Sequence, residues 1–160
     1  MQAPVAWKEA AAEPAAMCYD VAYADTDAGG IVYHARYVEM AERSRNRAMA
    51  LLGVPVQEML ARFGVQFLIR EVRVVCHRPG FIGDALLLAS GITTVSAARV
   101  SWRTAISRGG DGLCDVEAQV AAFDPVSRGP CLIPDALMAL LGRSPRMAPL
   151  RRAPMMKTGL

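Results

Sequence analysis

The segment Tyr23–Tyr37, YADTDAGGIVYHARY, gathers side chains that can move protons or stabilise charge. It holds two aspartates, two adjacent glycines and one of the two histidines of the 160-residue chain. A plain turn needs only glycine and one aspartate, whose side chain accepts a hydrogen bond from the backbone that follows it. The second acid, the histidine and the tyrosines therefore indicate a functional site as well as a turn.

Three kinds of chemistry could use the sequence Asp25-Thr26-Asp27. A calcium-binding EF-hand loop requires a bidentate glutamate at its twelfth position, where this chain has Arg36, and a cation repels calcium. A magnesium-dependent phosphotransfer site needs further acids and a lysine on an α/β domain, whereas the downstream sequence predicts antiparallel strands. The third kind is carboxylate chemistry, in which one aspartate attacks a carbonyl carbon or activates water.

The third kind of chemistry suits the helix that is predicted to follow. Apolar residues recur at three- and four-residue steps from residue 34 or 35 to Leu52, which is typical of an amphipathic helix. Its first N–H groups lack internal partners and its dipole adds positive charge, so an oxyanion would be stabilised there. Asp27 could attack or activate water, and His34 could supply a proton or orient a substrate. Gly29 and Gly30 would let the backbone approach a ligand.

A structural interpretation of the same residues stays open, because Asp-Gly clusters are common in turns and a histidine at a helix start is often only a surface residue. The flanking elements indicate an α+β fold. A strand is expected over Met17–Ala24, a short helix over Val56–Arg62 and a closing helix over Pro134–Leu141. Further strands are expected over Val65–His77, Ala85–Val95, Arg99–Ser107 and Leu113–Phe123. Tight turns join them, which predicts an antiparallel sheet with the long helix on one face.

Composition and length are those of one globular domain, expected over residues 17–142. The chain is 53% hydrophobic, and its apolar runs are far shorter than the roughly 18 residues of a membrane span. Residues 1–16 are interpreted as a loose extension without the pattern of a secretory signal. Residues 143–160 carry five basic residues and no acid, which indicates a disordered basic tail. A solvated tail is favoured over contact with nucleic acid or acidic membrane lipids, because the spread charges make a weak patch.

The four cysteines, Cys18, Cys76, Cys114 and Cys131, form no CxxC pair and lack the spacing of zinc ligands. They are expected to be buried free thiols in a reducing, cytoplasmic compartment, and no metal is expected. Cys76 and His77 are neighbours in a predicted strand. Because adjacent strand residues point to opposite faces, they are not expected to act together as nucleophile and base.

The pattern Y-x-D-T-D-A-G-G-I-V-Y-H-x-x-Y-x-x-x-x-E-R-x-R, from Tyr23 to Arg45, resembles the hotdog-fold acyl-CoA thioesterases of the 4-hydroxybenzoyl-CoA thioesterase type. It is similar above all to the YbgC-like, Tol-Pal-associated branch, and the similarity extends from about Cys18 to Leu141. The resemblance implies a hotdog fold, with an antiparallel sheet wrapped around one long central helix. It also implies hydrolysis of an acyl thioester with no cofactor beyond the CoA of the substrate.

The resemblance assigns roles to individual residues. Asp27 matches the catalytic carboxylate, acting as nucleophile or general base, and the backbone N–H of His34 matches the group that polarises the thioester carbonyl. The His34 side chain and Tyr23 match further site positions, and Asp25 is expected to shape the loop. The substrate-binding residues expected on this basis are Gly29, Gly30, Tyr33, Tyr37 and Arg99. The sequence departs from close relatives at Ser96–Arg99 and at Cys131, both of which fall where CoA contacts are expected.

The resemblance also implies an assembly. Family members pair two subunits into one continuous sheet with the site at the shared interface, and they commonly form tetramers as dimers of dimers. Pairing would also cover an exposed sheet edge. The substrate is expected to be a short aliphatic or aromatic acyl group on CoA or on an acyl-carrier protein. A non-catalytic acyl-binding protein on the same fold is the alternative. Dehydratase-like chemistry is a third, although its usual histidine signature is not apparent.

Overall fold

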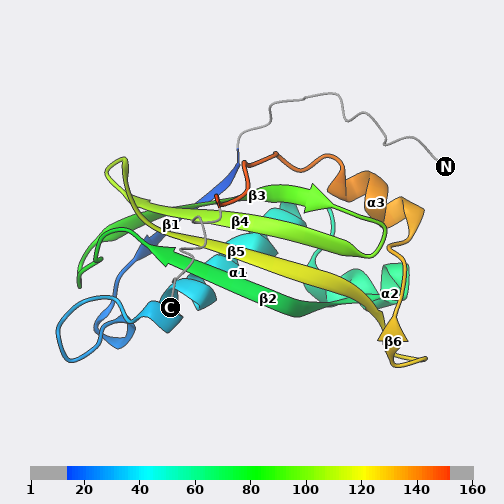
Figure 1. Ribbon diagram of the computed structural model, residues 1–160, viewed down its shortest axis with the longest axis horizontal. Helices are drawn as coiled ribbons and strands as arrows, with labels where there is room; N and C mark the ends of the chain where they lie inside the picture. Colours follow the sequence, from blue (N-terminus) through cyan, green and yellow to red (C-terminus); the bar gives the residue numbers. More distant parts are fainter. Residues whose placement is uncertain (1–13, 152–160) are drawn as a thin grey trace, which may run out of the picture.

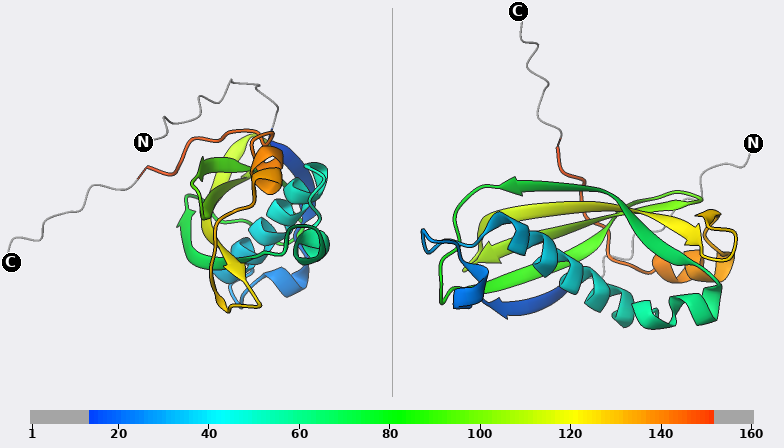
Figure 2. Two further views of the ribbon diagram at one scale, coloured as in Figure 1. Left: turned by 90° about the vertical axis from the view of Figure 1, so that its right-hand side faces the viewer. Right: turned by 90° about the horizontal axis from the view of Figure 1, so that it is seen from below.

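A single long helix, α1 (His34–Leu51), lies along the concave face of a curled antiparallel sheet (Figures 1 and 2). The computed structural model describes residues 14–151 of the chain. The strands are β1 (Ala15–Asp20), β2 (Gln66–Cys76), β3 (Ala85–Val95), β4 (Arg99–Arg108), β5 (Asp111–Asp124) and the short β6 (Gly129–Pro130). Two further helices, α2 (Met59–Phe63) and α3 (Asp135–Leu141), cover the end of the sheet beside the C-terminus of α1.

The sheet has the order β1-β3-β4-β5-β2, and β6 pairs with the end of β5. All of its pairings between named strands are antiparallel, as the tight turns in the sequence predict. The sheet curls around α1 in the end-on view of Figure 2, so the α+β hotdog architecture expected from the sequence is confirmed. Within the described chain, β2 is an outer strand that pairs only with β5.

The first strand differs from the expectation. It ends at Asp20 instead of continuing to Ala24, because the Ala22 N–H donates to the side chain of Asp25 and the chain turns into a 3₁₀ helix over Tyr23–Asp25. Tyr23 therefore lies outside the strand in which it was predicted, and its side chain is 83% exposed. The remaining strands lie within a few residues of their predicted bounds.

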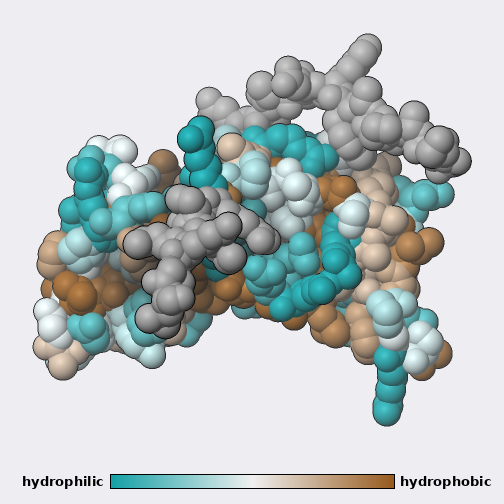
Figure 3. Space-filling model, viewed as in Figure 1, coloured by the Kyte–Doolittle hydropathy of each residue, from teal (hydrophilic) through white to brown (hydrophobic). Residues whose placement is uncertain are grey.

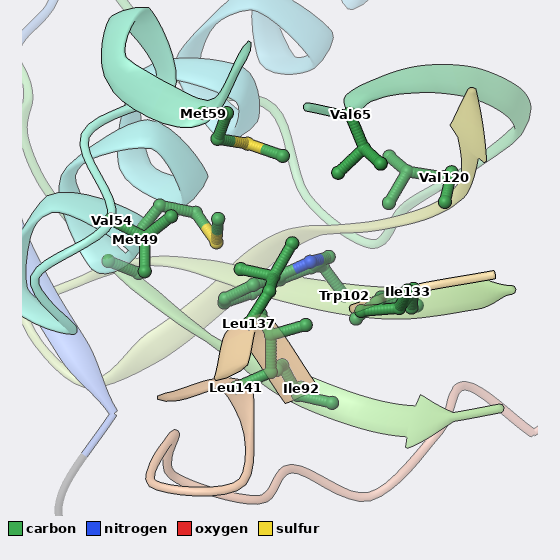
Figure 4. Close-up of a cluster of buried hydrophobic side chains, with 13 residues drawn as sticks. Met49, Val54, Met59, Val65, Ile92, Trp102, Val120, Ile133, Leu137 and Leu141 are labelled. Atoms are coloured by element: carbon green, nitrogen blue, oxygen red, sulfur yellow. The ribbon is translucent and has the colours of Figure 1, made fainter. Parts of the chain in front are cut away.

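The core consists of two apolar clusters between the helices and the sheet. One cluster surrounds the buried Trp102 and contains residues of α1, α2, α3 and the sheet (Figure 4). The other cluster packs the N-terminal half of α1, including Tyr37 and Met40, against Leu88 and Ile106. Together they hold the start of α1, and the loop before it, against one end of the sheet.

A buried trio of hydroxyls joins α1 to the sheet. The Ser90 hydroxyl of β3 donates to the Ser44 hydroxyl of α1 at 2.7 Å and lies 2.7 Å from the Thr104 hydroxyl of β4. All three side chains are buried, so each would lose hydrogen bonds to water if the helix shifted along the sheet. The trio therefore favours one register of α1, which fixes where its first residue lies.

After α3 the chain turns around the edge of β3, onto the face of the sheet opposite α1. We call residues 144–151 the C-terminal strap. The Ile92 N–H donates to the Pro145 carbonyl, and the Met147 N–H donates to the Ile92 carbonyl, both at 3.0 Å. The strap crosses directly above Gly91, where a Cβ would lie only 2.8 Å from the Pro145 carbonyl.

Two arginines of the sheet hold the rest of the strap. Arg103 donates to the Ala148 carbonyl at 2.9 Å, and Arg73 donates to the Arg151 carbonyl at 2.9 Å. The first residues of the expected tail, 143–151, are thus folded onto the domain. Residues 152–160 and 1–13, which include most of the expected N-terminal extension, lie outside the described residues, and the domain boundaries stay predictions. No helix in the described part of the chain is long and apolar enough to cross a membrane.

The close crossing at Gly91 generates a prediction. Gly91→Ala should lower the free energy of unfolding by about 1–3 kcal/mol, because the added methyl overlaps backbone that cannot rotate away. Gly112→Ala is the control, since a Cβ there meets nothing within 4 Å. Urea unfolding measures both variants. Equal stability of the two would mean that the strap does not hold this close contact in solution.

Candidate active site

The carboxylate of Asp25 ties together the end of β1, the following loop and α1. It is 2% exposed and accepts hydrogen bonds from the Tyr19 hydroxyl and the Ala22 N–H, both at 2.9 Å. Arg36, on the first turn of α1, donates to the same carboxylate from Nε at 3.0 Å and from Nη2 at 2.8 Å. Asp25 therefore has the loop-shaping contacts that its expected role requires.

These contacts also set the protonation of Asp25. Burial by itself would raise the pKa of the carboxyl. The hydrogen bonds from Ala22, Arg36 and Tyr19, with the positive charge of Arg36, outweigh burial and hold the pKa below its ordinary value. The group is consequently an anion at neutral pH, with its oxygens engaged by the protein rather than by a ligand.

Asp27 lies two residues further along and is exposed. Its Oδ1 accepts the Gly29 N–H at 2.8 Å, and its backbone carbonyl accepts the Gly30 N–H at 3.0 Å. Gly30 has φ +74°, a conformation that side chains rarely adopt, so a glycine suits this position. Among the described residues, nothing donates a hydrogen bond to Oδ2 of Asp27. One carboxylate oxygen thus orients the side chain while the other faces solvent.

Asp27 opens onto a cleft of about 330 Å³ that also contains His34 and Tyr37. The opposite wall is the end of β2 and the segment after it, from Cys76 to Pro79. This wall is joined to the loop by backbone contacts at Gly80, whose carbonyl accepts the Val32 N–H at 2.9 Å and whose N–H donates to the Tyr37 hydroxyl at 3.2 Å. Burial raises the pKa of Tyr37, so its hydroxyl stays neutral.

The N-terminus of α1 points toward this cleft. His34 is the first helical residue, and Tyr33 precedes it without a side-chain cap. The Arg36 N–H donates to the Tyr33 carbonyl at 2.8 Å, so the N–H of His34 precedes the first internal hydrogen bond of the helix. A carboxylate, a backbone donor at a helix start and an imidazole therefore border the same space, which is an arrangement suited to acyl transfer.

The structure brings together only part of the predicted site. Asp27, His34 and Tyr37 line the cleft, and Gly29 and Gly30 form the loop beside it. Tyr33 is half-exposed, with its ring 4.5 Å from that of His34. Neither Tyr23 nor Arg99 lines the cleft of its own chain. Arg99 pairs with Ala121 of β5, whereas the cleft residue Cys76 pairs with Cys114 of the same strand. These two positions on β5 are seven residues apart, which is roughly 23 Å at 3.3 Å per residue.

Sequence reasoning missed a second pocket, of about 250 Å³, between α1, α2 and the start of β2. Met49, Met59 and Trp102 form its apolar floor, and Arg45 lies half-buried in its wall. Burial lowers the pKa of the Arg45 guanidinium, although the charge of Glu42 opposes this effect. The sequence signal was present, because Arg45 stands on the same helix as the apolar stripe. The apolar residues themselves were indistinguishable from ordinary core.

Known proteins resemble this chain in sequence and in fold. The pattern of the thioesterase-like superfamily matches residues 21–141. The chain is 31% identical over 120 residues to acyl-CoA thioester hydrolase YbgC of Escherichia coli O157:H7, covering 74% of this chain and 89% of the relative. It is 29% identical over 129 residues to 1,4-dihydroxy-2-naphthoyl-CoA hydrolase of Thermosynechococcus vestitus, covering 80% and 88% of the two chains. The 1,4-dihydroxy-2-naphthoyl-CoA thioesterase from Synechocystis shares the fold, with a TM-score of 0.71, 20% identity and coverage of 79% and 93%.

The buried carboxylate predicts how stability depends on pH. The stabilisation from Asp25 should be complete above the unfolded pKa of about 3.9 and should be lost as the pH falls through the lower folded pKa. Asp25→Asn should lower the free energy of unfolding at pH 7 by about 2 kcal/mol, as expected for lost charge-assisted hydrogen bonds. Urea unfolding at pH 7 and at intervals below pH 4 measures both effects.

Asp111→Asn is the matched control, because Asp111 pairs with Arg78 on an exposed surface at 3.0 Å. Its loss should change stability by less than about 1 kcal/mol. If Asp25→Asn and Asp111→Asn are equally stable, Asp25 does not anchor the loop.

Proposed function

The chain belongs to the thioesterase-like superfamily, and from this membership and the geometry of the cleft we propose that it hydrolyses acyl-CoA thioesters with Asp27 as the catalytic carboxylate. The observation that carries the proposal is the position of the Asp27 carboxylate. It is exposed, it is oriented by the Gly29 N–H, and it shares a cleft with the first residue of α1. Asp25 cannot take this role because its oxygens are buried and occupied.

In the proposed reaction, the thioester carbonyl oxygen points at the N–H of His34. The helix start stabilises the negative charge that develops on this oxygen. Asp27 either attacks the carbonyl carbon, giving an anhydride that water then hydrolyses, or takes a proton from an attacking water. The C–S bond breaks and CoA leaves as a thiolate, a good leaving group that needs little acid catalysis. The His34 imidazole and the neutral Tyr37 hydroxyl border the substrate.

We place the complete site at an interface between two copies of the chain that pair through β2. This outer strand carries three apolar side chains that are exposed in the single chain: Leu68 at 47%, Ile69 at 48% and Val72 at 37%. Figure 3 shows the outer face of the sheet as largely hydrophilic, with hydrophobic residues along the border that β2 occupies in Figure 1. An unpaired apolar strand edge is a strong candidate for pairing with another chain.

Antiparallel pairing of two β2 strands would also join the two pockets. The second pocket lies beside the start of β2 at Gln66–Ile69, and the catalytic cleft lies beside its end at Cys76. A twofold axis places the start of one β2 next to the end of the other. The acyl group would then enter the second pocket of one chain while its carbonyl meets Asp27 of the other.

The volume of about 250 Å³ and the apolar floor of the second pocket favour a short aliphatic or single aromatic acyl group. Arg70 on β2 is an exposed cation available to CoA phosphates or to an acidic carrier protein, and Arg78 at the cleft could exchange its exposed ion pair with Asp111 for the same contact. Further association into a dimer of dimers and a cytoplasmic location belong to the same proposal.

The test is thioester hydrolysis by an Asp27→Asn variant. Turnover should fall by about 10³-fold, as expected when a nucleophile or base is lost, while the thermal unfolding midpoint stays near that of the wild type. Asp20→Asn, an exposed acid at the end of β1, is the matched control and should retain full turnover. Release of free thiol from aliphatic and aromatic acyl-CoA measures the reaction. Full activity of Asp27→Asn contradicts the mechanism, and no thiol release by wild type indicates an acyl-binding protein instead.

The interface has a separate test. Val72→Lys places a charge on the unpaired edge and should convert dimers into monomers, with a parallel loss of turnover. Val126→Lys, at a turn where the side chain is 92% exposed, is the control and should leave both properties unchanged. Sedimentation velocity measures the assembly. A fully active wild-type monomer would refute an interfacial site.

A further inference from the structure

Two thiols face each other at the wall of the catalytic cleft. Cys76 is the last residue of β2 and lies directly opposite Cys114 of β5, with the two Sγ atoms 3.7 Å apart. Cys76 is exposed and lines the cleft together with Asp27 and His34, whereas Cys114 is 1% exposed. The expectation that all four cysteines are buried is therefore wrong: Cys76 and Cys18 are exposed, Cys131 is only partly buried, and Cys114 alone among the four is buried.

The backbone geometry of this pair suits a disulfide bond. The His77 N–H donates to the Leu113 carbonyl at 2.8 Å, which makes Cys76 and Cys114 a pair without mutual backbone hydrogen bonds. Side chains are closest in such pairs, whose Cα atoms lie about 4.5 Å apart, within the range that disulfides span. The sulfur atoms would need to approach by about 1.7 Å, to the bond length of about 2.05 Å.

The unequal exposure of the two thiols gives them different roles. An oxidant that enters the cleft reaches Cys76, while burial and the neighbouring sulfur raise the pKa of the Cys114 thiol and keep it protonated. With a peroxide, the Cys76 thiolate takes one oxygen and becomes a sulfenic acid. The Cys114 sulfur then displaces the hydroxyl, and its proton leaves with that oxygen as water. The net reaction converts two thiols and one hydrogen peroxide into one disulfide and two waters.

The bond would act on the cleft through the chain that follows Cys76. His77, Arg78 and Pro79 continue the wall, and Gly80 is hydrogen-bonded to both Val32 and Tyr37. Drawing the Cys76 sulfur toward Cys114 by up to about 1.7 Å changes the surface of the cleft wall where this connection begins. A misplacement of about 1 Å in an active site can cost about 10²-fold in rate.

We propose that Cys76 and Cys114 form a reversible disulfide on exposure to a peroxide, and that this bond distorts the cleft wall and lowers turnover. The effect on turnover rests on the proposed thioesterase function, whereas formation of the bond does not. The other two cysteines occupy different places. Cys18 lies on β1, at the opposite edge of the sheet from β2, and Cys131 follows β6.

The experiment uses a Cys18→Ser/Cys131→Ser protein, which retains only the facing pair, and the same protein with Cys114→Ser added. Each is treated with hydrogen peroxide, then blocked with a thiol-alkylating reagent. In the first protein we expect both thiols to be lost, a mass 2 Da below the reduced form, and a peptide in which Cys76 is linked to Cys114. Its turnover of acyl-CoA should fall about tenfold or more and return with dithiothreitol. The Cys114→Ser protein should form no such bond.

Two results would overturn the proposal. The first is oxidation of Cys76 to sulfinic acid, or a link between chains, in place of the Cys76–Cys114 bond. The second is complete formation of that bond with unchanged turnover. If no thioester is hydrolysed even by the reduced protein, the proposed function fails, and the mass measurement still decides whether the disulfide forms.

Discussion

The buried carboxylate of Asp25 is the interaction on which the candidate site depends. A carboxylate away from water is stable only when its oxygens are hydrogen-bonded and its charge is balanced. Here the donors come from β1, from the loop itself and from the first turn of α1. The hydrogen bonds to the Asp25 carboxylate therefore hold these three segments together. The loop that carries Asp27 cannot move away from the helix start without leaving this charge unpaired.

Two aspartates only two residues apart consequently have opposite environments. Asp25 is buried and its carboxylate is hydrogen-bonded within the protein, while Asp27 is exposed, lines the cleft and accepts one hydrogen bond from the Gly29 N–H. The helix start supplies the complementary positive end of a dipole at the same place. The apolar clusters and the hydroxyl trio keep α1 in register, so the helix and the sheet hold in place the loop that carries Asp27.

The long helix and the sheet were predictable from the sequence because each has a strong period, and the turns between strands are marked by glycine and proline. The division of roles between Asp25 and Asp27 came from the motif, and the contacts of Asp25 agree with it. Tyr23 was predicted to lie in a strand because the alternating pattern continues past Asp20, whereas a hydrogen bond from the Ala22 N–H to the side chain of Asp25 ends the strand early. The second pocket, and the strap held by Arg73 and Arg103, depend on residues far apart in sequence. Composition alone indicated a tail, whereas the carbonyl groups of this segment accept hydrogen bonds on the sheet from the Ile92 N–H and from the side chains of Arg73 and Arg103.

The strap also determines on which face of the sheet the described C-terminal residues lie. Because it carries the chain around β3 to Arg151, the described C-terminal end sits on the face of the sheet opposite α1. The cleft opens at the helix side of the same sheet, near the N-terminus of α1. A surface tether or a fluorescent label attached at Arg151 would therefore start on the far side of the sheet from Asp27 and leave the entrance of the cleft unobstructed.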